Sequence, residues 1–510
     1  MYSNRILKLL PIVFAIYFII FIYNENSNEL IFTDLVLPLI ITIPTILFFS
    51  IIIKFIIKND TKSILISSFL TIIFFIYMPI HNALYEFQIG RNTFLIPIFF
   101  ISSLIIIILF IKSKKNFEAL LKISYVIVLA LIIFNIGEIG FYSNIYSTSI
   151  DDNLIQKFSI DKKDYRDVYH IMLDEHTGTA PLQQYHNYNN SEFDNSLQNM
   201  GFFIPEKSFS NYKMTAYSMP SILNMDYIDN EFNSKEKESK ARISKMVENN
   251  VVSKSFEENG YEMIYFYNEF NQAPTDRADN ELCNKDFFIS VNGIISTKFM
   301  TFIFDNTPIL IVQILFDQWD IFDIDSLSYV NLVQNRLCVF NELPLVEERF
   351  SGPMFVHAHI VLPHPPFIFS SDGSINSYDD SISEHGRNAL YLSQLNYTSS
   401  LVLELVEELL VKEPQPIILI QSDHGYRDRL SPEYNEKSFS NFAAYYFPNI
   451  ELNANDYPII TPVNSFRILF NNNFGTSYDL LENKMYVIED NKFKDITASI
   501  ISNSTFNKLD

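Results

Sequence analysis

Ile417–Gly425, with the sequence IILIQSDHG, is an apolar run that ends in an Asp-His-Gly triplet. Pro414 and Pro416 precede it, and its apolar residues are too few for a helix but suit a strand buried on both faces. In open α/β sheets, ligands bind just beyond the carboxyl ends of the strands. Asp423 and His424 would lie at such an end, and a carboxylate beside an imidazole is a common ligand pair for a divalent metal ion. The alternative is a capping aspartate and a partly buried histidine at an ordinary turn.

A second segment has the same construction. Residues 167–174 (DVYHIMLD) have the length and apolar character of a buried strand that ends in Asp174, and Glu175 follows. If both strands belong to one sheet, Asp174 and Asp423 would meet at its carboxyl edge, where a bound cation relieves their mutual repulsion. The alternative role for Asp174 is the N-cap of the segment that follows it.

Residues 208–227 are rich in hydroxyl groups and predict a short helix with Pro220 in its first turn. Thr215 and Ser218 would then lie at or just before the helix N-terminus, where the dipole favours an alkoxide and a bound phosphate. A hydroxyl bound to a divalent metal ion is an activated nucleophile. The alternative is an N-cap, which is our interpretation of Ser218.

Residues 354–369 predict a third strand that runs into a turn around His364. His357 and His359 share one face of this strand and are interpreted as core histidines. His364 lies between two prolines in a rigid loop, where it could hold a phosphate oxygen or protonate a leaving group; the alternative is a structural turn. Residues 382–412 have helical spacing and lead to the Asp-His-Gly strand, so strand, helix and strand follow one another. This order predicts an α/β domain with a mostly parallel central sheet flanked by helices.

The N-terminal part of the chain contains five apolar stretches, each long enough to cross a bilayer as a helix. They are residues 6–23, 35–57, 64–85, 94–111 and 120–141. The alternatives are buried core helices and a transporter, which generally needs charges inside its spans. Lysines and arginines cluster on one side, so the positive-inside rule places the N-terminus in the cytoplasm and the following domain outside.

We predict three regions, and their charges differ. They are a transmembrane domain of five helices at residues 1–145, a juxtamembrane linker at 146–166 and a catalytic domain at 167–510. Residues 1–145 carry 10 Lys and Arg against 7 Asp and Glu, whereas the remainder carries 27 against 52. Such an acidic domain argues against nucleic acid binding, which relies on cations that neutralise phosphates. Its two cysteines, Cys283 and Cys338, lie where oxidation is permitted, but the sequence leaves their pairing open.

In its order of motifs the chain resembles the alkaline phosphatase/sulfatase superfamily. The similar branch is membrane-anchored, with five N-terminal spans and an extracytoplasmic sulfatase-like domain, and includes lipoteichoic acid synthases and lipid A phosphoethanolamine transferases. The resemblance assigns the nucleophile to Thr215 in TAYSMP, the metal ligands to Asp174, Thr215, Asp423 and His424, and the substrate histidine to His364 in His-Pro-Pro.

Three departures from the family pattern stand out. The Cys-x-Pro-Ser-Arg motif of sulfatases is replaced by Ser218-Met-Pro-Ser-Ile, which argues against sulfate ester hydrolysis. No histidine follows His424, and the triplet continues as Tyr426-Arg427 instead of Glu-Ser, so an additional metal or phosphate ligand is missing. Glu175 stands where relatives often have a small residue, and is a candidate spare ligand or substrate contact.

The resemblance implies a membrane-bound transferase that uses one divalent ion, Zn²⁺ or Mn²⁺. Thr215 would take a phosphoglycerol or phosphoethanolamine group from a phospholipid, forming a phospho-threonine intermediate, and pass it to a cell-surface glycan or glycolipid with help from His364. The site would face the periplasm or the exterior of a bacterial-type inner (plasma) membrane. The alternatives are a phosphodiesterase or sulfatase of the same superfamily and a non-catalytic glycan-binding envelope protein. Donor head group, acceptor, metal identity and oligomeric state stay open.

Overall fold

The structure is a computed structural model that forms two compact units. It describes residues 6–26, 35–86, 92–145, 154–228, 242–243, 245–266, 281–283, 303, 307–308, 324–376, 384–428, 431, 433–489 and 492–504. One unit comprises residues 1–145 and 286–331, and the other comprises residues 146–285 and 332–510. The domain boundaries given above stay a prediction.

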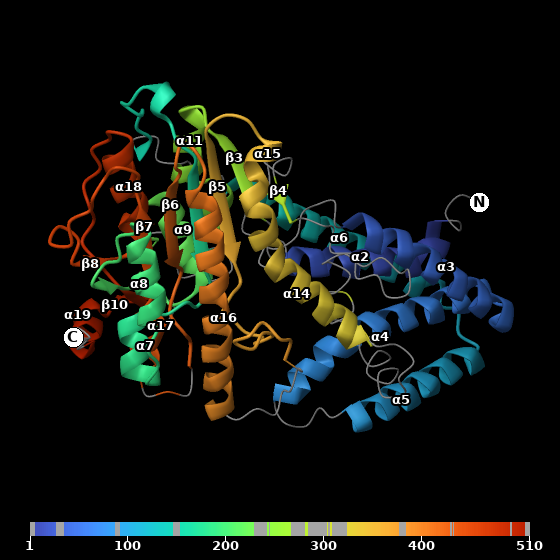
Figure 1. Cartoon of the computed structure of the whole chain (residues 1–510). Coiled ribbons are helices and arrows are strands. Elements are labelled where there is room, and N and C mark those ends of the chain that lie inside the picture. Colours follow the sequence, from blue (N-terminus) through green and yellow to red (C-terminus); the bar gives the residue numbers. More distant parts are fainter. Residues whose placement is uncertain are drawn as a thin grey trace. The chain divides into compact units, whose positions relative to one another are not determined.

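The described part of the first unit contains five long apolar helices (Figure 1). They are α2 (Leu10–Glu25), α3 (Val36–Ile57), α4 (Asp60–Glu86), α5 (Asn92–Lys112) and α6 (Glu118–Ile145), with the 3-10 helix η1 (Leu7–Leu9) before α2. All five are long and apolar enough to cross a membrane, so the five predicted stretches do form helices of sufficient length. In the most apolar 18-residue stretch of α3, and likewise of α5, 6% of the residues are buried. Such extensive apolar exposure suits lipid rather than water and argues against core helices of a soluble protein. The orientation of the N-terminus stays a prediction.

A six-stranded sheet forms the centre of the second unit. In spatial order its strands are β4 (Glu281–Leu282), β3 (Glu262–Phe266), β5 (Met354–Ile360), β1 (Val168–Leu173), β6 (Ile417–Ser422) and β7 (Ala443–Tyr446). Neighbouring strands are parallel except for β6 and β7. Every residue of β1, β5 and β6 is buried, as their continuous apolar runs indicated. The predicted α/β fold class is therefore confirmed.

Helices lie on both faces of this sheet (Figure 1). The described helices that follow α6 are α7 (Thr179–His186), α8 (Ser191–Asn199), α9 (Thr215–Asn224), α11 (Val251–Glu258), α14 (Ile324–Glu342), α15 (Val346–Arg349), α16 (Glu384–Leu410), α17 (Tyr434–Phe439), α18 (Ser465–Asn473) and α19 (Thr497–Asn503). Smaller elements are η4 (Lys162–Asp164), η7 (Leu343–Leu345), η8 (Pro462–Asn464) and the strand pairs β2 (Lys207–Ser208) with β8 (Ile459–Ile460) and β9 (Tyr486–Glu489) with β10 (Lys492–Asp495). Helices α9, α11 and α18 share one apolar cluster with the sheet, and the long α16 runs along the other face.

The register of the central strands brings their terminal acids together. Leu173, the last residue of β1, pairs with Ser422, the last residue of β6. Asp174 and Asp423 are the next residues of two parallel neighbours, so they leave the sheet side by side. The strand on the other side of β1 ends at the same level, because Leu173 also pairs with Ile360.

Part of the predicted linker at 146–166 packs into the second unit. Phe158 is 9% exposed and stacks on Phe474, with 4.1 Å between ring centroids. The described end of this segment is therefore anchored in the apolar core rather than a free tether. Cys283, which follows β4, forms a disulfide with Cys338 of α14, so the pairing that the sequence left open is present.

A pair of neutral histidines lies inside the sheet. Gln421 Nε2 lies 3.0 Å from His170 Nε2, and His170 Nδ1 lies 2.8 Å from His357 Nδ1. The amide donates to His170 Nε2, so the proton of His170 sits on Nδ1 and is donated to His357. Burial lowers the pKa of His357 to about 3 and that of His170 well below its usual value.

Acidification from pH 7 to pH 5 is expected to destabilise the second unit. An unfolded histidine titrates near 6.5, whereas folded His357 stays neutral, so the unfolded state binds more protons as the pH falls below about 6.5. Each such histidine costs about 1.4 kcal/mol per pH unit in this window. The midpoint of thermal unfolding should fall less steeply with pH in a His357→Gln variant. Parallel pH profiles for the two proteins would contradict the buried neutral pair.

Candidate metal centre

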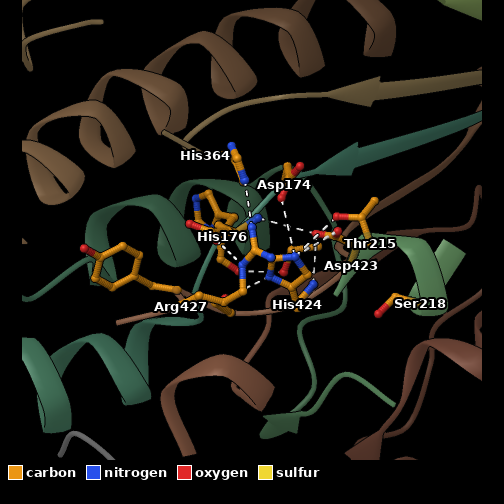
Figure 2. A network of polar contacts seen from close by, with 12 residues as sticks. Asp174, His176, Thr215, Ser218, His364, Asp423, His424 and Arg427 are labelled. Atoms are coloured by element: carbon orange, nitrogen blue, oxygen red, sulfur yellow. Dashed lines mark hydrogen bonds and ion pairs between the residues drawn. The ribbon is translucent and has the colours of Figure 1, made fainter. Parts of the chain in front are cut away.

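Three side chains able to hold a metal ion meet at the carboxyl ends of β1 and β6 (Figure 2). His424 Nε2 lies 3.3 Å from Asp423 Oδ2 and 3.7 Å from Asp174 Oδ1. One ligand atom from each residue lies within 4.8 Å of the other two, and all three residues are fully buried. In the described part of the chain, both carboxylate oxygens of Asp174 and Oδ2 of Asp423 have no hydrogen-bond partner. Buried carboxylates without donors are costly, so these residues fit a divalent cation that takes their oxygens as ligands.

Hydrogen bonds orient two of these side chains. His424 Nδ1 lies 2.9 Å from the carbonyl oxygen of Gly425, so Nδ1 carries the proton and Nε2 presents its lone pair to the carboxylates. Asp423 Oδ1 accepts the backbone N–H of His424 at 2.9 Å, which leaves Oδ2 directed at the same point. This is the protonation pattern that a metal-binding histidine needs.

Gly425 allows the chain to pass close to the end of α17. A Cβ atom at this position would lie 2.2 Å from the carbonyl oxygen of Lys437 and 2.6 Å from that of Ser440. Both are backbone atoms, so a side chain here forces the strand end and α17 apart.

We therefore expect Gly425→Ala to destabilise the second unit by about 3 kcal/mol or more and to displace His424. Thermal unfolding and metal content of the purified protein would measure both effects. Gly137→Ala is the control, because a Cβ there meets nothing within 4 Å. Equal midpoints and metal contents for the two variants would contradict the tight packing.

Thr215 reaches this group from helix α9. It is the first residue of α9, and its Oγ1 lies 3.3 Å from His424 Nε2. Its side chain is partly exposed, whereas the other three residues are buried, so it is the member that faces an incoming molecule. The positive end of the helix dipole favours a negative oxygen at this position. The structure thus brings Thr215, Asp174, Asp423 and His424 together (Figure 2).

Ser218 lies apart from this group (Figure 2). Its Oγ donates to the carbonyl oxygen of Tyr212 at 2.9 Å, and the side chain is buried. The interpretation of Ser218 as an N-cap is wrong, because the N-cap of α9 is Met214. The placement of Pro220 in the first turn is also wrong: the helix already begins at Thr215, and Pro220 lies inside it.

His364 enters the site from the loop after β5. Its Nε2 lies 2.8 Å from Arg427 Nη2, and its Nδ1 lies 2.6 Å from the carbonyl oxygen of Pro365. A guanidinium only donates and a carbonyl only accepts, so in this arrangement the ring carries its proton on Nδ1 and accepts at Nε2.

Two buried side chains from different helices hold the His364 loop. Arg336 of α14 donates to the carbonyl oxygens of His364, Pro365 and Pro366 at 2.8, 3.1 and 3.0 Å. Gln394 of α16 donates to the carbonyl oxygens of Pro363 and His364 at 3.0 and 3.1 Å. These contacts fix the loop by its backbone and leave the imidazole ring to face the site.

Sequence reasoning missed His359, which lies next to the first acid. Its Nε2 is 3.6 Å from Asp174 Oδ2, and the residue is 1% exposed. The interpretation as a core histidine fits His357 but not His359, which is two residues nearer the carboxyl end of the strand. Burial would raise the pKa of Asp174, but His364, His359 and His424 hold that pKa below its usual value. Asp174 is therefore ionised, and its oxygens could serve as metal ligands.

Comparisons with known proteins find similarity at the level of three-dimensional structure. No protein-family model and no curated protein sequence matches the chain. The C-terminal periplasmic domain of EcEptC from Escherichia coli is 11% identical, with coverage of 67% of this chain and 96% of that one and a TM-score of 0.41. The soluble domain of lipooligosaccharide phosphoethanolamine transferase A from Neisseria meningitidis is 10% identical, with coverages of 62% and 90% and a TM-score of 0.39. The lipoteichoic acid synthase LtaP from Listeria monocytogenes is 11% identical, with coverages of 64% and 77% and a TM-score of 0.38. Similarity this weak assigns no function to this chain by itself.

Proposed function

We propose that this chain is a membrane-anchored, metal-dependent phosphotransferase of the alkaline phosphatase/sulfatase type, with Thr215 as its nucleophile. The observation that carries the proposal is the position of the Thr215 hydroxyl, 3.3 Å from His424 Nε2 and beside buried carboxylate oxygens without donors. A structural threonine at a helix start has no need of such neighbours. A divalent ion, Zn²⁺ or Mn²⁺, held by Asp174, Thr215, Asp423 and His424 would supply the Lewis acidity that stabilises a threonine alkoxide.

The reaction proceeds in two displacements at phosphorus. Thr215 Oγ1 first forms a bond to the phosphorus of a phospholipid head group, and the bond from phosphorus to the diacylglycerol oxygen breaks. The threonine proton is released, and the diacylglycerol oxygen takes one up. An acceptor hydroxyl of a glycan or glycolipid then attacks the phospho-threonine, and Thr215 leaves. His364 lies beside the centre and contacts Arg427, and it would assist proton transfer at the leaving or the entering oxygen.

The apolar helices support a phospholipid donor. Five helices able to span a membrane belong to the same chain, so the site stays near a bilayer. The chain beyond residue 145 has an excess of acidic residues, so attraction of a phosphate group depends on local cations rather than on a basic surface. The head group is phosphoglycerol or phosphoethanolamine, and the acceptor lies at the cell surface.

Diacylglycerol release tests this function. Full-length protein in nanodiscs that contain phosphatidylglycerol or phosphatidylethanolamine is supplied with Zn²⁺ or Mn²⁺, and the lipids are analysed by mass spectrometry. We expect diacylglycerol from one of the two lipids, and none after chelation of the metal. Release of the matching soluble phosphate ester without an acceptor would identify a hydrolase. Bound metal with no diacylglycerol from either lipid would contradict a phospholipid donor.

A further inference from the structure

Glu175 and Arg427 form an ion pair beside the metal centre. Arg427 Nε lies 2.5 Å from Glu175 Oε1, and the side chains are 17% and 2% exposed. Arg427 Nη2 donates to His364 Nε2 at 2.8 Å. Within the described residues, no hydrogen bond occupies Arg427 Nη1. Two of the three guanidinium nitrogens are thus held in place, Nε by Glu175 and Nη2 by His364 (Figure 2).

The backbone of Glu175 is held in a conformation that side chains rarely adopt. Its φ is 65°, in the left-handed region, although it is not a glycine. Tyr391 of α16 donates to its carbonyl oxygen at 2.9 Å, and its own N–H points to Asp423 Oδ1 at 3.4 Å. Such conformations persist where surrounding contacts impose them, often at functional sites. Here they direct the carboxylate of Glu175 to Arg427.

The charges of the site balance when a divalent ion is present. Burial would lower the pKa of Arg427, but Glu175, Asp174 and Asp423 raise it, so the guanidinium stays charged. Three carboxylates carry three negative charges, and one guanidinium with one divalent ion carries three positive charges. A phosphodiester adds one negative charge, whereas a phosphate monoester adds nearly two at neutral pH. The second negative charge has a large electrostatic cost here, because the site is buried and screening is weak.

We propose, building on the function proposed above, that Arg427 binds a non-bridging phosphate oxygen of the substrate through Nη1 and that Glu175 positions it there. The pair gives the site a preference for singly charged phosphodiesters over phosphate monoesters. A planar guanidinium already held at two nitrogens orients the phosphate with little further loss of freedom. Thr215 then attacks the phosphorus, while Arg427 binds one of the non-bridging oxygens on the same phosphorus.

Removing the guanidinium should weaken phosphate binding without removing the metal ion. Full-length wild-type protein, Arg427→Gln and Arg427→Lys are loaded with Mn²⁺ and titrated in a calorimeter with dimethyl phosphate, a singly charged diester. We expect a loss of about 10- to 100-fold in dimethyl phosphate affinity for Arg427→Gln, the size of a charge-assisted hydrogen bond. Arg427→Lys keeps a charge and should retain part of the affinity. Arg166→Gln is the matched control, because Arg166 precedes β1 at the other end of the strand and donates to the carbonyl oxygen of Gln415.

Charge selection is tested with two small esters. Bis-p-nitrophenyl phosphate is a diester and p-nitrophenyl phosphate is a monoester, and kcat/KM is measured for both. We expect the wild type to prefer the diester and Glu175→Gln to shift the ratio toward the monoester, because the amide keeps the contact with Arg427 but removes one negative charge. A structural role of Glu175 would lower both values together.

The outcomes separate this inference from the proposed function. If the wild type releases no diacylglycerol but binds dimethyl phosphate in a manner that depends on Arg427, the lipid transferase fails and the anion site stands. Dimethyl phosphate affinity equal in wild type and Arg427→Gln, or absent from both, overturns the anion site. Loss of bound metal from Arg427→Gln and Arg427→Lys alike would also overturn it, because Arg427 would then be a support of the metal centre.

Discussion

Thr215→Ala is expected to lower turnover of the phospholipid by about 10³-fold or more, because it removes the atom that attacks phosphorus. The metal ion should still bind when it is supplied in excess, since Asp174, Asp423 and His424 remain. Thr215→Ser keeps a hydroxyl and should retain part of the activity. Diacylglycerol release in nanodiscs measures the loss.

Ser221→Ala is a suitable control for this experiment. Ser221 lies on the same helix as Thr215, is fully buried, and donates to the carbonyl oxygen of Asp226 at 2.7 Å. Its replacement removes a structural hydrogen bond, at a cost of about 1 kcal/mol, and leaves the metal centre intact. Turnover by Thr215→Ala at the rate of Ser221→Ala would show that another group is the nucleophile.

Loss of metal binding is the second large effect that we expect. Asp423→Asn removes a buried negative charge but keeps an oxygen that can accept the N–H of His424. Metal affinity should fall by about 100-fold or more, as seen when a ligand or its support is changed. Bound metal after dialysis, measured by elemental mass spectrometry, gives the result directly.

In the metal-free protein, Asp423→Asn should not lower the thermal stability, although it lowers the metal affinity. Without metal, Asp174 and Asp423 lie close together in a buried site and repel each other. Metal-free Asp423→Asn should therefore unfold at the same temperature as the metal-free wild type or at a higher one. Metal at 100 times its dissociation constant should stabilise the wild type by about 2.7 kcal/mol and the variant by much less. A variant that binds metal as the wild type does would contradict the proposed ligand set.

The sequence was sufficient to predict the fold class and the meeting of the two acids. Residues 168–173 and 417–422 are continuous apolar runs, and parallel strands that are buried on both faces require such runs. Each run is followed by an aspartate, and parallel neighbours end at the same edge. The pairing of Leu173 with Ser422 was not predictable from either segment, and a shift of one residue would have turned one of the acids toward the other face of the sheet.

The positions of His359 and Arg427 depend on contacts between distant segments, and the sequence does not show which segments meet. His359 faces Asp174 because β5 pairs with β1 in a register that aligns Met172 with His359. Arg427 is three residues from His424, but its pairing with Glu175 requires the left-handed backbone at Glu175. That conformation follows from tertiary contacts, which override local preference.

The start of α9 shows how local signals mislead. Proline favours the first turn of a helix, so the sequence predicted a helix that starts just before Pro220. The helix starts at Thr215 instead and accommodates Pro220 in its interior. Ser218 consequently lies inside the helix and contacts the loop behind it, whereas Thr215 takes the N-terminal position.

The role of Thr215 as the nucleophile is tested most directly by the mass of the protein after reaction with its donor lipid. Full-length protein loaded with Mn²⁺ or Zn²⁺ is incubated with phosphatidylglycerol or phosphatidylethanolamine without an acceptor, and its intact mass and peptides are analysed. We expect a phosphoglycerol or phosphoethanolamine adduct on Thr215 that is absent from Thr215→Ala. An adduct on a different residue, or diacylglycerol release without any adduct on Thr215 even in rapidly quenched samples, would contradict this role.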